Sequence, residues 1–307
     1  MSPPAELDRR GLAYGFSAYF LWGLFPLYWP LLEPTGSLEI LADRLVFSLV
    51  FVSLLVWRMH SWQSVRAVLA DRGKTGQLCV AAVLVTTNWG VYIWGVNSGH
   101  VIETSLGYFI NPLFTILLGV FVLHERLRRA QWLAVAVASV AIVVLSVDYG
   151  RLPWIALTLA GSFGMYGFIK KRVSVGAMES LVIETGAMTV PALITLGVIA
   201  ANGSLSFGRH GAGHAGLLIG TGVVTAIPLL FFGAATTRLP LTVIGLLQYL
   251  TPILQFAVGA GIDHESVPAA RWAGFSLVWV ALAILSVDGL RSQRRSATER
   301  AAAESAA

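Results

Sequence analysis

Apolar residues in this chain occur in long unbroken runs that are separated by short polar segments. Each run holds roughly 18 to 22 residues, the length that an α-helix needs to cross about 30 Å of hydrocarbon. The pattern therefore predicts an all-α polytopic membrane protein with ten transmembrane helices. The predicted spans are 11–32, 38–57, 77–97, 101–123, 130–148, 152–169, 179–200, 214–235, 240–261 and 270–289.

The segments between the spans are short, and the longest are 58–76 and 201–213. Neither has room for a soluble domain. Within the first, Trp62, Val65 and Leu69 recur at helical spacing among polar and basic residues. This spacing predicts a short helix that lies in the membrane interface.

One stretch of the sequence is present twice. Of the 48 residues in 101–148, 13 are identical to the residue 140 positions later, and these identities include Pro112 with Pro252 and Trp132 with Trp272. The identities cluster at a proline, at a polar His-Glu pair between two spans and at the C-terminal end of a predicted helix, so chance is a poor explanation.

The repeat divides the chain into a first five-helix unit at 1–148, a second at 149–289 and a cytoplasmic tail at 290–307 that we expect to be disordered. Because five is an odd number, the second unit must enter the membrane in the opposite orientation. The fold class predicted is therefore two inverted five-helix repeats. Inverted repeats are typical of secondary transporters, in which two similar halves exchange conformations around a central site.

Composition and charge agree with this arrangement. With 56% hydrophobic and 12% charged residues, the chain is too apolar for an ordinary soluble domain. An N-terminus inside the cell places 17 of the 21 Lys and Arg residues in the cytoplasm, which is a strong positive-inside bias. It predicts a multi-pass protein of the inner or plasma membrane with both termini cytoplasmic.

The net charge of +5 needs no nucleic-acid partner, because cytoplasmic flanks that face anionic lipid account for it. Cys79 is the only cysteine, which excludes an intramolecular disulfide and a cysteine metal cluster.

Several motifs together resemble the RarD-type permeases of the EamA family, in the drug/metabolite transporter superfamily. They are Ala18-Tyr-Phe-Leu-Trp-Gly23 with Pro26, Glu39-Ile-Leu-Ala-Asp-Arg44, Asn88-Trp89, Ile93-Trp-Gly-Val-Asn97 and Glu103-Thr-Ser-Leu-Gly-Tyr-Phe-Ile-Asn-Pro-Leu113. The resemblance covers residues 11–290 and implies a ten-helix inner-membrane transporter fold. It also implies the association of that family with chloramphenicol sensitivity, and it leaves the substrate open.

Arg44 is the best single candidate for binding an anionic substrate group or for a gating ion pair. An ionisable side chain this deep in a span should face the helix bundle and hold a partner, although it could also extend to the outer surface. Asp43 is not its internal partner, because neighbours in sequence do not face each other on a helix.

Aromatic and amide side chains supply further candidates. Trp22 either lines a cavity or belongs to the interfacial aromatics, and Pro26 should kink its helix. Asn88 and Tyr92 lie four residues apart on one face. A buried Asn either joins helices or contacts substrate.

The fourth predicted span carries Glu103, Gly107, Asn111 and Thr115 at every fourth position, and Pro112 frees the carbonyl of Tyr108 beside this polar stripe. The ninth span also combines polar residues on one face with a proline, at Gln248, Thr251, Pro252 and Gln255. Proline-interrupted helices at equivalent positions of two halves indicate a binding site at the membrane midplane. The alternative is a pair of seams where small residues pack.

Other ionisable residues are harder to assign. Glu184 has no obvious partner in its own helix; it either carries a proton in a buried site or is hydrated near the cytoplasmic end. The pairs His124-Glu125 and His264-Glu265 stand alone at helix ends without a second His at one-turn spacing, so a metal site is rejected in favour of capping or gate contacts.

We therefore expect a secondary-active permease of a small metabolite or drug-like molecule, with alternating access around a midplane cavity. Its aromatic walls would favour a planar or amphipathic substrate, and Glu103 or Glu184 would take up a coupling proton. The predicted substrate pathway comprises Trp22, Arg44, Asn88, Trp89, Tyr92, Glu103, Tyr108, Asn111, Glu184, Gln248, Thr251 and Gln255, with helix kinks at Pro112 and Pro252.

We expect no metal and no cofactor; the partners are the lipid bilayer and the substrate, and a homodimer is compatible with the pattern. A membrane-embedded enzyme would need a clustered nucleophile and base, which the sequence does not offer. A non-transport assembly protein would not need mirrored polar positions at the midplane, and a channel would favour a ring of like charges.

Overall fold

The computed structural model describes residues 8–123, 129–173, 175–236, 238, 247–262, 264, 268–269, 272–284 and 287–288. Within these residues the secondary structure is helical and contains no strand. The helices are α1 Arg9–Gly23, α2 Phe25–Tyr28, η1 Trp29–Leu32, α3 Ser37–Arg58, α4 Trp62–Ala70, α5 Arg72–Asn97, α6 Val101–Leu123, α7 Arg129–Tyr149, α8 Trp154–Val173, α9 Ala177–Ala201, α10 Gly211–Thr236, α12 Leu250–Gly261 and a further helix at Trp272–Ile284.

Helices occupy the first eight predicted spans, and α12 and Trp272–Ile284 lie within the last two. Four of the described helices are both long and apolar enough to cross a membrane by length and composition. They are Ser37–Arg58, Arg72–Asn97, Ala177–Ala201 and Gly211–Phe232. The chain is thus an all-helical, multi-pass membrane protein, while the count of ten spans stays a prediction.

Two local predictions are confirmed. The short helix expected between the second and third spans is α4, which buries Val65 and exposes most of its other residues. The kink expected at Pro26 divides the first span, because α1 ends at Gly23 and α2 begins at Phe25. Proline has no N–H to donate, so the α1 hydrogen-bond ladder cannot continue through Pro26.

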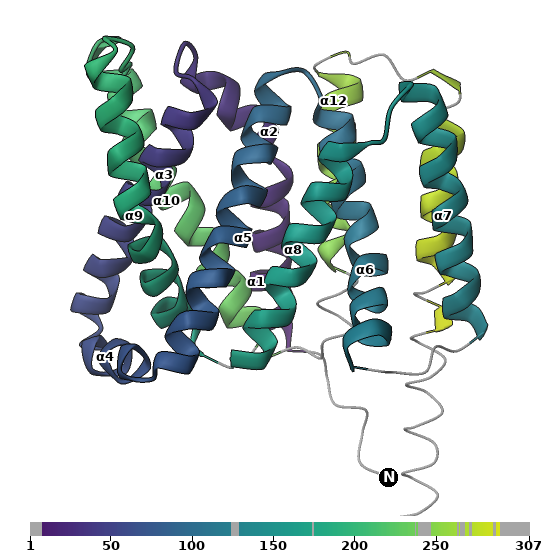
Figure 1. Cartoon of the computed structure of the whole chain (residues 1–307), viewed down its shortest axis with the longest axis horizontal. Helices are drawn as coiled ribbons and strands as arrows, with labels where there is room; N and C mark the ends of the chain where they lie inside the picture. Colours follow the sequence, from purple (N-terminus) through teal and green to yellow (C-terminus); the bar gives the residue numbers. More distant parts are fainter. Residues whose placement is uncertain are drawn as a thin grey trace, which may run out of the picture.

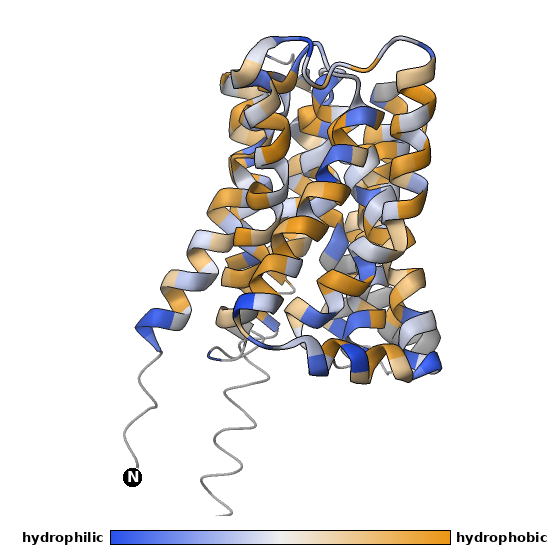
Figure 2. Ribbon diagram, turned by 90° about the vertical axis from the view of Figure 1, so that its left-hand side faces the viewer, coloured by the Kyte–Doolittle hydropathy of each residue, from blue (hydrophilic) through white to orange (hydrophobic). Residues whose placement is uncertain are grey.

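The distribution of side chains differs from that in a soluble protein. Charged residues such as Glu39, Arg44 and Glu184 are buried, whereas large apolar residues such as Leu54, Val143 and Leu193 are exposed. Figure 2 shows apolar residues along the helices and hydrophilic residues gathered towards the two ends of the bundle. An exposed apolar surface of this extent suits contact with lipid, and the bilayer surrounds the middle of the bundle.

Helices that are distant in sequence lie side by side (Figure 1). α3 packs against α5, α9 and α10, and α8 packs against α5 and α6. α12 contacts α6 and α1, so the predicted fourth and ninth helices adjoin each other. At the other side of the bundle, α7 meets Trp272–Ile284 through Ala134, Ala138 and Ala281.

The contact between α10 and α3 depends on a glycine. A Cβ atom at Gly222 would stand 2.5 Å from the backbone carbon and oxygen of Phe47, closer than van der Waals contact allows. The absent side chain therefore lets the two helix backbones approach closely, as small residues do at helix interfaces in membranes.

We expect Gly222→Ala to lower the free energy of unfolding by roughly 1–3 kcal/mol, because overpacking a tight contact forces the backbones apart. Thermal unfolding of the purified protein in detergent measures the change. The matched control is Gly216→Ala on the same helix, where an added Cβ meets nothing within 4 Å. Equal unfolding temperatures for the two variants would contradict the prediction.

Candidate functional site

Polar side chains from five helices meet in the interior of the bundle. We call Arg44, Asn88, Tyr92, Tyr108, Thr225 and Gln255 the central polar cluster. These residues come from α3, α5, α6, α10 and α12, and hydrogen bonds, ring contacts and electrostatic interactions connect them. An ionisable residue inside the membrane is a functional-site hypothesis by default, so the presence of Arg44 makes this cluster the candidate site.

Arg44 is 2% exposed, so its guanidinium group lies in the interior and does not extend to the outer surface. Its Nε donates a hydrogen bond to Oγ1 of Thr225 at 2.7 Å. The guanidinium carbon lies 4.0 Å from the ring centroid of Trp89, 5.1 Å from that of Trp29 and 5.7 Å from that of Phe25. Aromatic faces attract a cation, but they do not neutralise its charge.

Two buried donors beside these rings have no acceptor. Within the described part of the chain, Nη1 of Arg44 and Nε1 of Trp29 make no hydrogen bond, and no carboxylate pairs with Arg44. A buried cation without an anionic partner is costly. Trp29 was missed by the sequence analysis as a site residue; its seven-residue spacing from Trp22 was the available signal.

Asn88 joins α5 to two other helices. Its Nδ2 donates to the carbonyl oxygen of Leu159 at 3.0 Å and to Oγ of Ser162 at 3.1 Å, and its Oδ1 accepts from the Tyr108 hydroxyl at 3.1 Å. Of the two alternatives left open for a buried Asn, these contacts favour the role of joining helices.

The predicted ninth helix reaches the cluster through Gln255. Its Nε2 donates to the Tyr92 hydroxyl at 3.0 Å and to the carbonyl oxygen of Trp22 at 3.2 Å. One turn earlier, Oγ1 of Thr251 donates to the carbonyl oxygen of Tyr19 at 2.8 Å. α12 is thus attached to α1 and α5, while the half-buried ring of Trp22 packs against Tyr19 and Phe232.

The proline positions differ in their surroundings. Residues 247–248 are helical, Tyr249 interrupts the helix, and Pro252 lies in the first turn of α12. A proline there leaves no helical hydrogen bond unmade. α6 runs through Pro112 without a break. Gln248 is half-buried just before the interruption.

The predicted polar stripe on α6 is divided between two kinds of contact. Glu103 forms an ion pair with Arg151 at 2.8 Å and accepts from the backbone N–H of Ile155 at 3.3 Å. At Gly107 an added Cβ would lie 2.8 Å from Cβ of Leu159, so this part of the stripe packs against α8. Asn111 is buried one turn further along α6.

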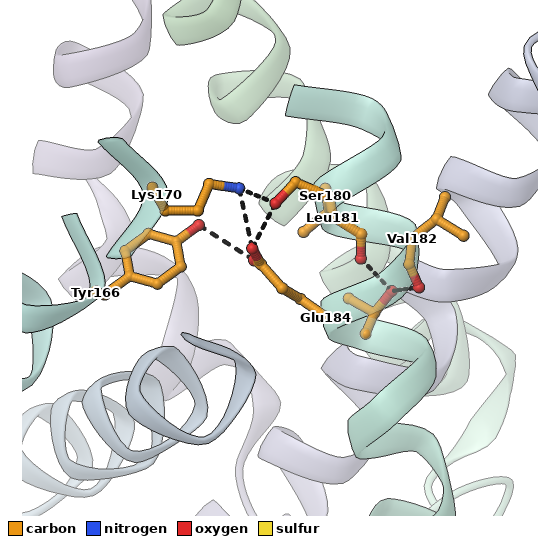
Figure 3. Close-up of polar contacts among 7 residues, drawn as sticks. Tyr166, Lys170, Ser180, Leu181, Val182 and Glu184 are labelled. Carbon is orange, nitrogen blue, oxygen red and sulfur yellow. Dashed lines mark hydrogen bonds and ion pairs between the residues drawn. The ribbon is translucent and has the colours of Figure 1, made fainter. Parts of the chain in front are cut away.

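Glu184 has partners that the sequence analysis did not find. Figure 3 shows its carboxylate between Lys170 and Tyr166 of α8 and Ser180 of its own helix α9. The ion pair to Lys170 measures 2.9 Å, and the hydroxyls of Ser180 and Tyr166 donate at 2.6 and 3.1 Å. The expectation that Glu184 lacks a partner in its own helix is therefore wrong, because Ser180 precedes it by one helical turn.

Grooves in the surface are lined by apolar side chains. One, of about 420 Å³, is lined by Leu24, Phe25, Tyr28, Val224 and Pro228, among others, and thus includes the Phe25 ring that lies 5.7 Å from the Arg44 guanidinium carbon. Another, of about 410 Å³, is lined by Phe109, Tyr249, Ile253, Trp279, Leu282 and Ala283. Both are apolar, and neither is lined by a residue of the predicted substrate pathway. Of the cluster, Arg44, Asn88, Tyr92, Thr225 and Gln255 are buried, and Tyr108 is half-buried.

Among the residues described, no group of three or more His, Cys, Asp and Glu side chains is arranged to hold a metal ion. His124, Glu125 and Glu265 of the two predicted corners lie outside the described residues, as does the tail at 290–307.

Comparison with known proteins decides the family. The sequence model of the EamA-like transporter family matches residues 9–147. Protein RarD of Streptomyces exfoliatus is 54% identical over 300 residues, which cover 98% of this chain and 94% of that protein. The chain belongs to the EamA-like transporter family. Within it the chain is a RarD-type permease, and thus a membrane transporter.

Other relatives extend the likeness along the whole chain. Protein RarD of Escherichia coli (strain K12) is 40% identical and covers 95% of this chain and 98% of its own length. The chloramphenicol-sensitive protein RarD of Pseudomonas aeruginosa is 29% identical, with 95% and 98% covered. A crystal structure with 16% sequence identity shares the fold at a TM-score of 0.59, over 90% of this chain and 97% of that chain.

We expect Asn88→Ala to lower the free energy of unfolding by roughly 1–3 kcal/mol, because it leaves the buried hydroxyls of Ser162 and Tyr108 with one partner fewer. Thr87→Ala is the control, since the exposed Thr87 hydroxyl bonds only within its own helix. Thermal unfolding in detergent compares them, and an unchanged midpoint for Asn88→Ala would show that this network does not hold α5, α6 and α8 together.

Proposed function

We propose that this permease is a secondary-active carrier of a small organic anion, with alternating access around the central polar cluster. The observation that carries the proposal is the buried guanidinium of Arg44, which has a free donor and no carboxylate partner in the described structure. A substrate carboxylate would accept from Nη1 of Arg44 and Nε1 of Trp29. The surrounding aromatic rings favour a planar or amphipathic molecule.

The pattern of helix contacts supports two inverted repeats. The repeat relates each predicted span of one half to the span five places away in the other half, so that α1 corresponds to α8, α3 to α9, α5 to α10 and α6 to α12. Under this correspondence the α3–α10 contact matches α9–α5, the α1–α10 contact matches α8–α5, and the α1–α12 contact matches α8–α6. The contacts α3–α9 and α6–α12 each join two corresponding helices. A pseudo-two-fold axis that relates the halves would produce this exchange. The shift of 140 positions also places Arg44 on Glu184.

Contacts at the two ends of the bundle support alternating access. At one end, Glu103 pairs with Arg151, and Glu39 accepts from the backbone N–H groups of Ser206 and Phe207. At the other end, Lys170 pairs with Glu184. With both sets formed, five of the six residues of the central polar cluster are buried, Arg44 among them. Opening to one side would require that one set separates while the other holds.

In the cell membrane we place both termini and α4 in the cytoplasm and the loops with Arg151 and Arg209 outside, as the positive-inside rule favours. Ser64 of α4 and Ser204 of the 202–210 loop are both exposed. In a Cys79→Ser background, Ser204→Cys should react with an impermeant maleimide added outside intact cells, and Ser64→Cys only after permeabilisation. The reverse pattern would overturn the orientation.

Uptake into proteoliposomes tests the substrate class. We would compare labelled solutes that match in shape and differ in charge, such as nicotinate and nicotinamide, with and without a pH gradient. We expect uptake of the anions, and a decrease of roughly tenfold or more in Arg44→Gln, since hydrogen bonds to charged groups contribute about 1.5–3 kcal/mol.

The control is Val140→Ala, at an exposed apolar position of α7, which should transport like the wild type. Equal anion uptake by the wild type and Arg44→Gln at matched protein amounts would refute the role of Arg44. Preference for the neutral member of each pair would refute the anion class while leaving a carrier function intact.

A further inference from the structure

We propose that Asp43 is the proton-binding residue of this carrier, and that protonation of its carboxyl group is coupled to anion binding at Arg44. The inference rests on the proposed carrier function. It replaces Glu103 and Glu184, the two acids that the sequence favoured for a coupling proton, with a residue that the sequence analysis did not assign.

Three of the four buried acids in the described chain have partners that stabilise a carboxylate. Glu103 is paired with Arg151, and Glu184 with Lys170. Glu39 accepts from the backbone N–H of Ser206 at 2.8 and 3.1 Å and from that of Phe207 at 2.9 Å. Charge-assisted hydrogen bonds of this kind satisfy an ionised group.

Asp43 is the exception. It is 3% exposed, its Oδ2 is fully enclosed, and in the described part of the chain its carboxyl group forms no hydrogen bond or ion pair. Arg44 does not serve as a partner, because its guanidinium lies over Trp89 and bonds to Thr225. An ionised carboxylate in such a place is costly, whereas a neutral acid avoids most of that cost.

The elements around α3 do not supply a compensating charge. Glu39, one turn earlier on the same face, carries a negative charge that disfavours a second carboxylate. On α5, Tyr92 bonds to Gln255, and Arg72 and Lys74 lie at the far end of the helix. On α9, Glu179 and Glu184 are themselves acids, and on α10 the ring of His214 bonds to Thr35 and the Leu32 carbonyl.

Electrostatic interaction within the membrane interior would couple the two sites. Asp43 and Arg44 are consecutive residues of α3 whose side chains point in different directions, but an anion bound to Arg44 still brings negative charge into the interior near Asp43, where charges are weakly screened, so it favours the protonated carboxyl group. By linkage, a proton on Asp43 favours the anion to the same degree. A hydronium ion on one side of the membrane gives its proton to a carboxylate oxygen, and the O–H bond breaks to release that proton to water on the other side. The carrier would then move the anion and the proton together.

Infrared spectroscopy tests the protonation directly and needs no substrate. Purified protein in lipid nanodiscs should show the C=O stretch of a protonated, enclosed carboxylic acid at neutral pH. We expect this band to be lost in Asp43→Asn, which is nearly isosteric, and to be retained in Glu184→Gln and Glu103→Gln. A band that persists in Asp43→Asn, or its absence from the wild type at every pH from mildly acidic to mildly alkaline, would overturn the proposal.

Coupling is tested in the nicotinate proteoliposomes. The wild type should take up nicotinate faster under an inward proton gradient and acidify an enclosed pH dye, whereas Asp43→Asn should lose both the stimulation and the acidification. Stimulation that survives in Asp43→Asn would overturn the inference. Lack of transport of any anion by the wild type would refute the proposed function instead, and the infrared result would still decide whether Asp43 holds a proton.

Discussion

Burying a guanidinium group inside a bilayer is the constraint on which the arrangement of this molecule depends. The charge of Arg44 cannot be removed by deprotonation at ordinary pH, and hydrocarbon offers nothing to solvate it. The surrounding residues therefore meet it with three aromatic faces and one hydroxyl. These contacts bring α3, α5, α10 and the segment from α2 to η1 to one point.

The other buried charged residues differ from Arg44 in the partners that they have. Glu39, Glu103 and Glu184 are matched by backbone donors or cations from neighbouring segments. Such matched pairs hold elements in place. Arg44 and Asp43 lack such matches in the described chain, as expected of groups whose partners arrive from solution.

Much of this organisation could be predicted from the sequence because the bilayer constrains it. The length of the apolar runs, Pro26 and the spacing of Trp62, Val65 and Leu69 correspond to helices α1 to α10 within a few residues. Burial of Arg44, Asn88, Glu103, Glu184 and Gln255 followed from the cost of exposing polar groups to lipid. Their contacts did not follow, because the partner of Glu103 is 48 residues away and those of Arg44 come from α2, η1, α5 and α10. The position of a residue along a membrane span can thus be predicted from the sequence more readily than the neighbours that its side chain contacts.

The contact of Glu39 has a consequence for how relatives of this chain are compared. The carboxylate binds the backbone N–H groups of Ser206 and Phe207, not their side chains. The hydrogen bonds themselves need only the two N–H groups, so proline, which has no N–H, is the substitution that removes one directly. Other demands act on the side chains, since Ser206 is buried and the Phe207 ring stacks on Phe47. A relative with different side chains in the loop can therefore keep the same hydrogen bonds to Glu39. A comparison of aligned sequences would therefore detect the constraint on the Glu39 side chain more readily than the constraint on the loop backbone that it binds.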